Sequence, residues 1–167
     1  MDFLELIEKR YSVRAFQDRP VEETKLQKIL EAARLAPTAA NRQPFRLLVV
    51  ATRGREEALR RIYSRDWFVQ APYIIGICAV ASEAWVRRDG RNYAVVDATI
   101  AMDHLILAAA NLGLGTCWVA AFDEKAAREV LAIPAEWDPV AFTPLGYPAD
   151  EWKPKKRRPL SDVLKKI

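Results

Sequence analysis

The sequence predicts a single domain, residues 1–167, in which helices cover both faces of one sheet, a fold of the α/β or α+β class. The chain has 167 residues, the usual length of one domain with one hydrophobic core. Hydrophobic residues make up 51% and charged residues 29%, which excludes a disordered chain, a fibrous repeat and a disulfide-stapled miniprotein. Segments with helical periodicity alternate with short apolar runs, as expected when helices pack on a sheet.

The N-terminal part predicts two helices separated by a non-helical segment. Residues 2–9 carry apolar side chains at helical spacing behind Asp2, which is a good N-cap. Residues 12–19 are expected to be extended or looped. A second helix is predicted over about residues 22–35, and Pro37 ends it because proline cannot continue a helix.

Four apolar runs rich in branched residues predict the strands of the sheet. They cover residues 45–51, 73–80, 116–121 and 140–145. The first two are apolar almost throughout, so we expect both to be buried strands. Between them, residues 55–64 predict an amphipathic helix with a basic outer face.

Residues 94–112 form the longest apolar stretch, 19 residues, and predict a helix that is apolar on nearly every side. Asp97, Asp103 and His104 interrupt it, and charges are costly in the middle of a membrane. We therefore expect a buried helix and no membrane span. In a chain of this size, a second copy of the protein is one surface able to cover such a helix.

The C-terminal part predicts a capped helix, a basic tail and a short closing helix. Asp123 is expected to cap a helix over residues 124–131. Residues 150–167 contain seven basic and three acidic residues, so this tail carries the whole formal charge of +4 and residues 1–149 sum to zero. The chain closes in a short helix near residues 161–166. Composition alone therefore does not make the folded body a nucleic-acid binder.

The cysteines and the N-terminus indicate a cytoplasmic protein. Cys78 and Cys117 each lie in an apolar stretch, without the spacing of a disulfide framework or a zinc site. Two buried thiols fit a reducing cytosol. The first ten residues carry acids where a signal peptide needs bases, and they contain no long apolar segment.

Several common catalytic arrangements are excluded by the residues present. His104 is the only histidine, so a multi-histidine metal site is out of reach and a histidine-based triad would depend on this residue. We expect it to bond its neighbours within the predicted helix. No Walker-type phosphate loop occurs. The segment Gly113-Leu-Gly115 follows a helix and not a strand, so it is interpreted as a helix stop.

Two basic clusters at opposite ends of the chain indicate a binding site for an anion. Arg10, Ser12 and Arg14 alternate, so all three point to one side of an extended backbone and form a cradle for a phosphate. The second cluster, residues 153–158, reads Lys-Pro-Lys-Lys-Arg-Arg. One phosphorylated ligand can use both clusters if the tail folds back over the body. Each cluster alone is also compatible with solvated surface charge, and the second with a flexible polyanion-binding tail.

Two further segments offer polar groups to a flat ligand. The loop at residues 37–44 is bounded by prolines and combines hydroxyl and amide side chains with two alanines. Small side chains at Ala120 and Ala121 leave backbone N–H groups open to a planar ring. The alternatives are an ordinary helix-to-strand connector for the loop and a plain core strand for residues 116–122.

Five motifs together resemble the FMN-dependent nitroreductases, in particular their short prokaryotic members, over nearly the whole chain. They are Arg10-Tyr-Ser-Val-Arg-Ala-Phe16, Ala33-Arg-Leu-Ala-Pro-Thr-Ala-Ala-Asn-Arg-Gln-Pro-Phe45, Leu112-Gly-Leu-Gly-Thr-Cys-Trp118, Leu145-Gly-Tyr-Pro148 and the closing Lys-Arg-Arg-Pro-Leu160. Each motif is weak alone. Five in the right order at compatible spacing are specific.

The resemblance implies an α+β fold, with a central mixed or antiparallel sheet sandwiched by helices, in an intertwined homodimer that binds FMN at the dimer interface. The resemblance implies that FMN is contacted by residues from four parts of the chain. They are Arg10, Tyr11, Ser12 and Arg14, the last near the pyrimidine edge; Pro37, Thr38, Ala39, Ala40 and Asn41 from the second subunit; Ala120 and Ala121 at the N5/O4 edge; and Lys155 and Arg157 at the phosphate. Lys156 and Arg158 are alternative choices for the phosphate-binding pair. No residue is assigned a catalytic role, and no metal is implied.

The activity implied by the resemblance is reduction of nitroaromatic, quinone or flavin acceptors by NAD(P)H through FMN, with a ping-pong mechanism. The chain is too short for the insertion that shapes substrate binding in larger members, and it has Ala-Ala where Gly-Ala is commoner before Phe122. The Asn and Lys that some larger members use ahead of the second strand are not evident near residues 64–67. A dehalogenating or flavin-degrading relative is one alternative. A non-enzymatic protein that binds nucleic acid through the tail is the other.

Overall fold

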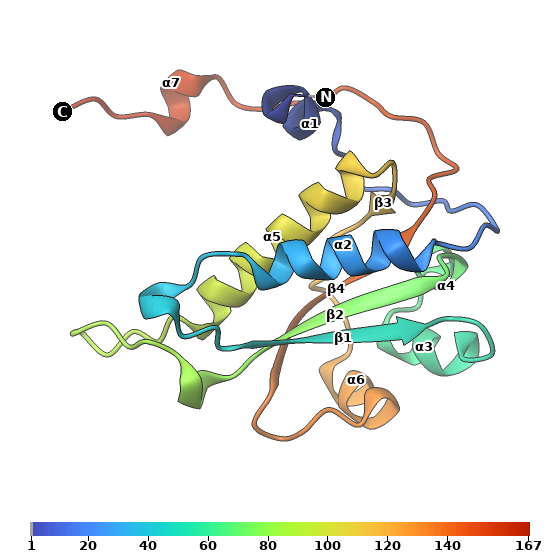
Figure 1. The fold of residues 1–167 in the computed structure, drawn as a ribbon, viewed down its shortest axis with the longest axis horizontal. Coiled ribbons are helices and arrows are strands. Elements are labelled where there is room, and N and C mark those ends of the chain that lie inside the picture. Colours follow the sequence, from blue (N-terminus) through green and yellow to red (C-terminus); the bar gives the residue numbers. More distant parts are fainter. Residues whose placement is uncertain (1) are drawn as a thin grey trace.

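The computed structural model describes residues 2–167, so Met1 of the predicted domain lies outside the described residues. Its centre is a four-stranded antiparallel sheet in the order β1-β2-β4-β3 (Figure 1). The strands are β1 (Phe45–Ala51), β2 (Tyr73–Ala79), β3 (Gly115–Thr116) and β4 (Asp138–Gly146). The α+β class is confirmed, and every pairing between these strands is antiparallel.

The second strand is the buried centre of the sheet, as the sequence predicts. It pairs with β1 from Tyr73↔Ala51 onward and with β4 from Tyr73↔Leu145 onward. Gly76 lies where a side chain has no room, because a Cβ there would approach the ring of Phe142 to 2.6 Å. The corresponding prediction for β1 is wrong. This strand has a neighbour on one side only, and most of its residues are half-buried or exposed.

The first face of the sheet is covered by the two longest helices, α2 (Glu23–Arg34) and α5 (Ala94–Asn111). Their apolar residues share one core with Ile75 and Ile77 of β2 and with Leu145 of β4. On the central strand, alternate residues point to opposite faces, so Ile74 and Cys78 belong to the core on the other side. Both faces are covered, as predicted.

The second face is covered by three shorter helices, α3 (Glu56–Ile62), α4 (Asp66–Gln70) and α6 (Glu124–Leu131). Asp123 caps α6 by accepting a hydrogen bond from the backbone N–H of Ala126 at 2.9 Å, as predicted. The helix α4 is not among the sequence predictions. It has five residues, which is too short for a helical period to show in the sequence.

The long helix α5 is only partly covered by its own chain. Eight of its 18 residues are buried, and Val95 remains 48% exposed. By length and hydropathy α5 could cross a membrane, but it packs between α2 and the sheet as a core helix. His104 bonds the carbonyl oxygen of Ile100 one turn earlier at 3.1 Å, as expected for a residue with a local role.

The predicted strand over residues 116–121 is shorter in the structure, because β3 ends at Thr116. At the next residue, the backbone N–H of Cys117 donates to the hydroxyl of Thr143 and not to a backbone carbonyl, at 2.9 Å. The ladder resumes once, where Val119 and Phe142 exchange two backbone bonds of 2.8 and 2.9 Å. The segment therefore follows β4 without forming a continuous strand beside it.

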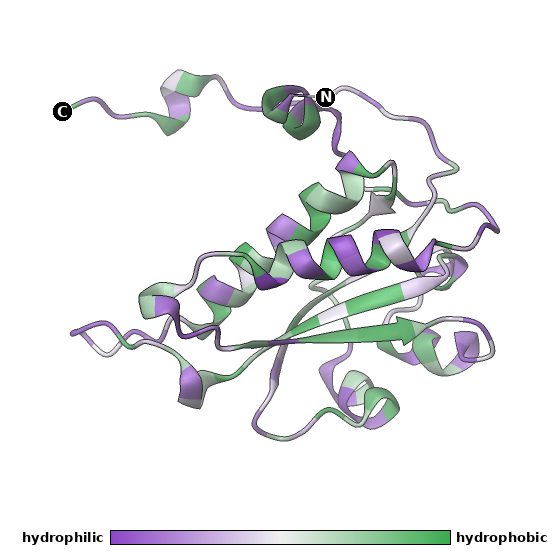
Figure 2. Cartoon of the chain, viewed as in Figure 1, coloured by the Kyte–Doolittle hydropathy of each residue, from purple (hydrophilic) through white to green (hydrophobic). Residues whose placement is uncertain are grey.

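Both termini lie on the same side of the molecule, away from the sheet (Figure 1). Asp2 caps α1 (Phe3–Lys9) by accepting from the N–H of Glu5 at 2.9 Å, as predicted. The closing helix α7 (Leu160–Val163) is shorter than predicted and begins one residue earlier. Figure 2 shows hydrophobic stretches on both helices, although neither covers the sheet. Their exposed apolar side chains are Phe3, Leu4, Ile7, Leu160 and Val163.

Candidate functional site

The segment between α1 and α2 crosses the sheet edge and ties the two ends of the chain together. The N–H of Val13 donates to the carbonyl of Thr116 at 2.9 Å, which places the segment beside β3. Further along, the N–H of Ala149 donates to the carbonyl of Ala15 at 2.8 Å. Val13 is buried and its neighbour Arg14 is exposed, so the alternation predicted for an extended backbone is present here.

The two basic clusters converge on one pocket of about 610 Å³. It is lined by Arg10, Tyr11, Ser12, Arg14, Asp150, Glu151, Lys153, Lys155 and Arg157. Five of these side chains are cationic and two are acidic. The first half of the tail thus folds back over the body. The N-terminal segment and the C-terminal tail, more than a hundred residues apart in sequence, form the two walls of the pocket.

Lys155 is the only tail residue between positions 151 and 160 that is not exposed. Its Nζ donates to the carbonyl oxygens of Ile7 at 2.5 Å and Arg10 at 2.8 Å, at the C-terminal end of α1. A cation there is favoured by the helix dipole. The pKa of Lys155 is lowered by burial and, less strongly, by the positive charges of Arg10 and Arg157. An anion in the pocket would relieve this repulsion between cations.

Asp150 joins the two walls through three hydrogen bonds. Its Oδ2 accepts from the backbone N–H of Arg14 at 2.8 Å, and its Oδ1 accepts from the hydroxyl of Tyr11 at 3.1 Å. The same hydroxyl lies 2.8 Å from the carbonyl oxygen of Asp150. Burial, and then the hydrogen bond and the charge of Asp150, raise the pKa of Tyr11 to about 12, so the hydroxyl keeps its proton. Asp150 could not be identified from the sequence, because neither it nor the adjacent Glu151 belongs to a recognisable motif.

Ala120 and Ala121 lie in the exposed turn between two fixed points. Before them, Val119 is bonded to β4, and after them the N–H of Asp123 donates to the carbonyl of Ile62 at 2.9 Å. Within residues 2–167, the N–H groups of Ala120 and Ala121 have no hydrogen-bond acceptor. Neither residue lines the basic pocket. They leave two donors open to a ligand, as the small side chains suggested.

The proline-bounded loop lies at the opposite end of α5 from the basic pocket (Figure 1). It contains a single 3-10 turn, Ala39–Asn41, whose Ala39 N–H donates to Asp97 in the first turns of α5. Ser12 of the pocket pairs with Thr116, beyond the C-terminal end of this helix, and α5 alone is about 27 Å long at 1.5 Å per residue. One chain therefore does not bring Pro37, Thr38, Ala39, Ala40 and Asn41 to the pocket.

The thiols of the chain are poor nucleophiles. Burial raises the pKa of Cys78 to about 11. Burial also raises the pKa of Cys117, although the nearby Arg14 opposes this. No group of three or more potential metal ligands occurs within residues 2–167. The described residues thus offer anion binding and open backbone donors, without an activated nucleophile or a metal centre.

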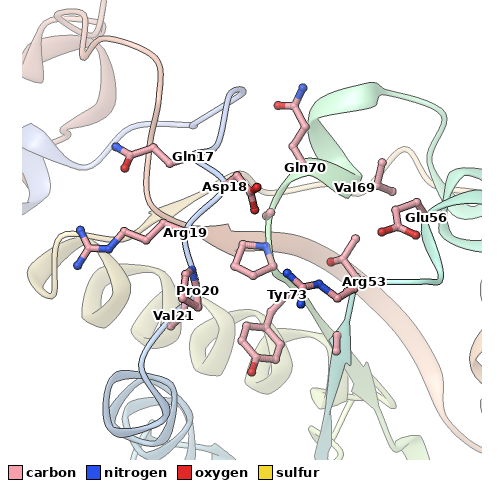
Figure 3. Close-up of a pocket in the computed structure, with 14 residues that line it drawn as sticks. Gln17, Asp18, Arg19, Pro20, Val21, Arg53, Glu56, Val69, Gln70 and Tyr73 are labelled. Carbon is pink, nitrogen blue, oxygen red and sulfur yellow. The ribbon is translucent and has the colours of Figure 1, made fainter.

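A second hollow, of about 430 Å³, lies beside the segment that follows Phe16 (Figure 3). Gln17 to Val21 line it together with the ends of β1, α4 and β2. It contains none of the residues predicted for the site. Beside it, Trp67 of α4 packs against the small core cluster of Val13, Phe16 and Ala71, which Tyr11 of the basic pocket also contacts.

The chain resembles known proteins along most of its length. The model of the Nitroreductase family matches residues 7–65 and 56–147. A protein of Methanothermobacter thermautotrophicus with the provisional name NADH dehydrogenase/NAD(P)H nitroreductase is 34% identical over 155 residues, which are 90% of this chain and 79% of that protein.

Two solved structures agree with this match. A nitroreductase family protein from Clostridium difficile 630 has a TM-score of 0.89 at 36% identity and covers 99% of this chain and 98% of its own. An FMN-dependent nitroreductase from Clostridium difficile R20291 has a TM-score of 0.77 at 28% identity, with 92% of each chain covered. Sequence, fold and site motifs thus lead to one conclusion: the chain belongs to the nitroreductase family.

Proposed function

We propose that the protein is an FMN-dependent oxidoreductase that takes electrons from NAD(P)H and passes them to nitroaromatic, quinone or flavin acceptors. The observation that carries this proposal is the convergence of both chain ends on one cationic pocket. FMN and NAD(P)H agree with the names of the relatives, one an FMN-dependent nitroreductase and one an NAD(P)H nitroreductase.

The pocket is suited to the phosphate of FMN. Arginine and lysine side chains bind phosphate oxygens through charge-assisted hydrogen bonds. We assign this role to Arg10, Ser12, Lys155 and Arg157, all of which line the pocket. Asp150 does not oppose the phosphate freely, because the N–H of Arg14 and the hydroxyl of Tyr11 hold its carboxylate. The hydrogen bond from Tyr11 to Asp150 thereby holds the N-terminal wall of the pocket against the wall formed by the tail.

The flat part of FMN requires donors and a surface without competing nucleophiles. When bound, FMN accepts a hydride from NAD(P)H and delivers electrons to the acceptor. Arg14, exposed at the pocket, supplies a positive charge for the pyrimidine edge. The open N–H groups of Ala120 and Ala121 supply hydrogen-bond donors for the opposite edge. No side chain has to act as an acid or a base for hydride transfer.

A homodimer completes the site in this proposal. The loop from Pro37 to Asn41 cannot reach the pocket of its own chain, so the second subunit has to supply it. The surface available for dimerisation is apolar: α5 is half-covered, and α1 and α7 expose large hydrophobic side chains. The second half of the tail, beyond Arg158, extends away from its own chain and is free to pack on the other subunit (Figure 1).

The ping-pong order follows from one site serving both substrates. The oxidised nucleotide, NAD(P)+, would leave before the acceptor occupies the same site. Two free, buried cysteines fit a cytoplasmic location. The alternative of nucleic-acid binding is weakened because Lys155 and Arg157 belong to the pocket. Dehalogenating or flavin-degrading chemistry uses the same cofactor, so substrate assays are needed to distinguish it from the proposed reduction of nitroaromatic, quinone or flavin acceptors.

The test is a titration of the purified protein, stripped of flavin, with FMN. We expect quenching of flavin fluorescence, a higher unfolding temperature and a dimer by light scattering. NADH or NADPH should then bleach the visible absorbance, and parallel double-reciprocal plots should identify the ping-pong order. A protein that stays colourless with excess FMN, and gains no thermal stability from it, would exclude the proposed function.

A further inference from the structure

The loop of residues 37–43 has an unusual backbone for a segment that contains no glycine. Ala40, Asn41 and Gln43 have φ angles of 51°, 53° and 53°, in the left-handed region. Side chains with a Cβ rarely adopt this region, and such residues gather where a function demands a particular backbone shape. The loop is therefore held in its shape by its surroundings.

Most hydrogen bonds of the loop are internal. The Thr38 hydroxyl accepts from the N–H of Gln43 at 3.0 Å, and the Gln43 side-chain amide donates to the carbonyl of Asn41 at 2.9 Å. Such bonds fix the shape of the loop but not its place on the protein. Within residues 2–167, two hydrogen bonds leave residues 37–43. The carbonyl of Gln43 accepts from the N–H of Phe45 at the start of β1 at 2.9 Å, and only the N–H of Ala39 reaches a distant element, where it donates to Asp97 Oδ1 at 3.0 Å.

Asp97 is an unusual residue to make this link. It is 2% exposed, and its other oxygen, Oδ2, has no hydrogen-bond partner in the described part of the chain. Buried carboxylate oxygens are almost always bonded, and exceptions occur at functional sites. An asparagine would supply the same acceptor at lower desolvation cost. The link to Ala39 thus carries the desolvation cost of a buried carboxylate, which offsets part of the stability that this hydrogen bond contributes.

We propose that Asp97 is a positioning residue that sets the loop of residues 37–43 for contact with the flavin held by the other subunit. This inference rests on the proposed function. Asp97 touches neither flavin nor substrate, and it acts through Ala39 and the left-handed Ala40 next to it. Its place in the first turns of α5 suits a carboxylate, because the N-terminal end of a helix favours negative charge.

The first experiment compares Asp97→Ala with Asp97→Asn by FMN fluorescence titration and by thermal unfolding without flavin. Alanine removes the acceptor of the Ala39 N–H, so we expect the Kd for FMN to rise about tenfold or more. Asparagine keeps an acceptor oxygen, so we expect its Kd to stay within about threefold of the parent value. Val50→Ala, in the core on the other side of the sheet, is the destabilised control and should retain its FMN affinity.

The outcomes separate a positioning role from a structural one. An Asp97→Ala protein that unfolds as early as Val50→Ala but binds FMN like the parent would overturn the inference. An Asp97→Asn protein as weak as Asp97→Ala would also overturn it. FMN binding by the parent protein is measured before any variant is compared. If the parent does not bind FMN, the proposed function itself is wrong.

The second experiment tests whether the loop acts on the other subunit. Co-expression of Asp97→Ala and Arg14→Ala chains with different tags gives mixed dimers in which one site combines an unaltered Arg14 with an unaltered loop. With equal mixing, we expect about a quarter of all sites to bind FMN with parent affinity. If the loop acts within its own chain, no such site forms, and the absence of tight sites would contradict the inference.

Discussion

The basic pocket and the proline-bounded loop are built in opposite ways. The pocket joins residues far apart in sequence, and bonds such as that between the N–H of Arg14 and Asp150 Oδ2 cross 136 positions. The loop of residues 37–43 is bonded mainly to itself and to the start of β1, and the bond from the N–H of Ala39 to Asp97 is its one hydrogen bond to a distant part of the chain. The pocket therefore depends on the whole fold, whereas the loop depends on local backbone shape and one tether.

This difference predicts where each region is vulnerable. Three left-handed residues in the loop cost about 1 kcal/mol each, so the loop needs its internal bonds to persist. The pocket shows no such strain, since its residues between 10 and 16 have ordinary φ angles. Its walls separate if the contacts between the two chain ends are lost.

The largest effect is expected at Gly115, which packs against Val13 between the pocket residues Ser12 and Arg14. A Cβ at this position would lie 2.6 Å from Cγ2 of Val13, a branched side chain that cannot move aside easily. Gly115→Ala should lower the free energy of unfolding by about 2 kcal/mol and weaken FMN binding together with it. Urea denaturation and FMN titration measure both.

A double variant shows whether this clash is the cause. Val13→Ala makes room for the new methyl group, so Gly115→Ala combined with Val13→Ala should be destabilised less than the sum of the single variants. Strictly additive losses in the cycle would mean that the wall does not depend on this contact.

The next effect concerns the charge of the pocket. Arg14→Ala should raise the Kd for FMN about 10- to 100-fold, the usual loss for a charge-assisted hydrogen bond in a binding site. Arg53→Ala is the matched control, since Arg53 lines the second hollow and makes no ion pair in the described chain. Equal FMN affinity for the parent and Arg14→Ala proteins would remove Arg14 from the site.

The smallest effect concerns the bond that holds the walls together. Tyr11→Phe removes the hydrogen bonds to Asp150 and should lower the free energy of unfolding by about 1 kcal/mol, with a rise of a few fold in the Kd for FMN. The pKa of Tyr11 is raised to about 12 in the folded protein. The stability from this hydroxyl is thus complete below about pH 10 and is lost as the pH rises through 12.

The difference in unfolding free energy between the parent and Tyr11→Phe proteins should therefore shrink between pH 10 and 12. Tyr63→Phe serves as the control, because the Tyr63 hydroxyl has no hydrogen-bond partner among residues 2–167. A difference that stays constant over this range would show that the bond to Asp150 does not stabilise the fold.

Predictability from the sequence follows the same division. The strand β1 and the caps of α1 and α6 were predicted from the sequence, because apolar runs and Asp caps are local signals. The exposed edge position of β1 was not, since strand order depends on partners elsewhere in the chain. The prediction of a strand beyond Thr116 was wrong for a related reason. The backbone N–H of Cys117 donates to the side chain of Thr143 and not to a backbone carbonyl.

The sequence by itself determined the family motifs, the alternation of Arg10, Ser12 and Arg14, and the family membership that these motifs indicate. Only the tertiary structure decided that the tail folds back, that Lys155 binds the end of α1, and that Asp150 and Asp97 hold the two regions in place. The physical reason is the separation along the chain over which each effect acts. Periodicity and side-chain chemistry act between neighbours in the chain, whereas a buried carboxylate acquires its role from the donors that folding brings to it.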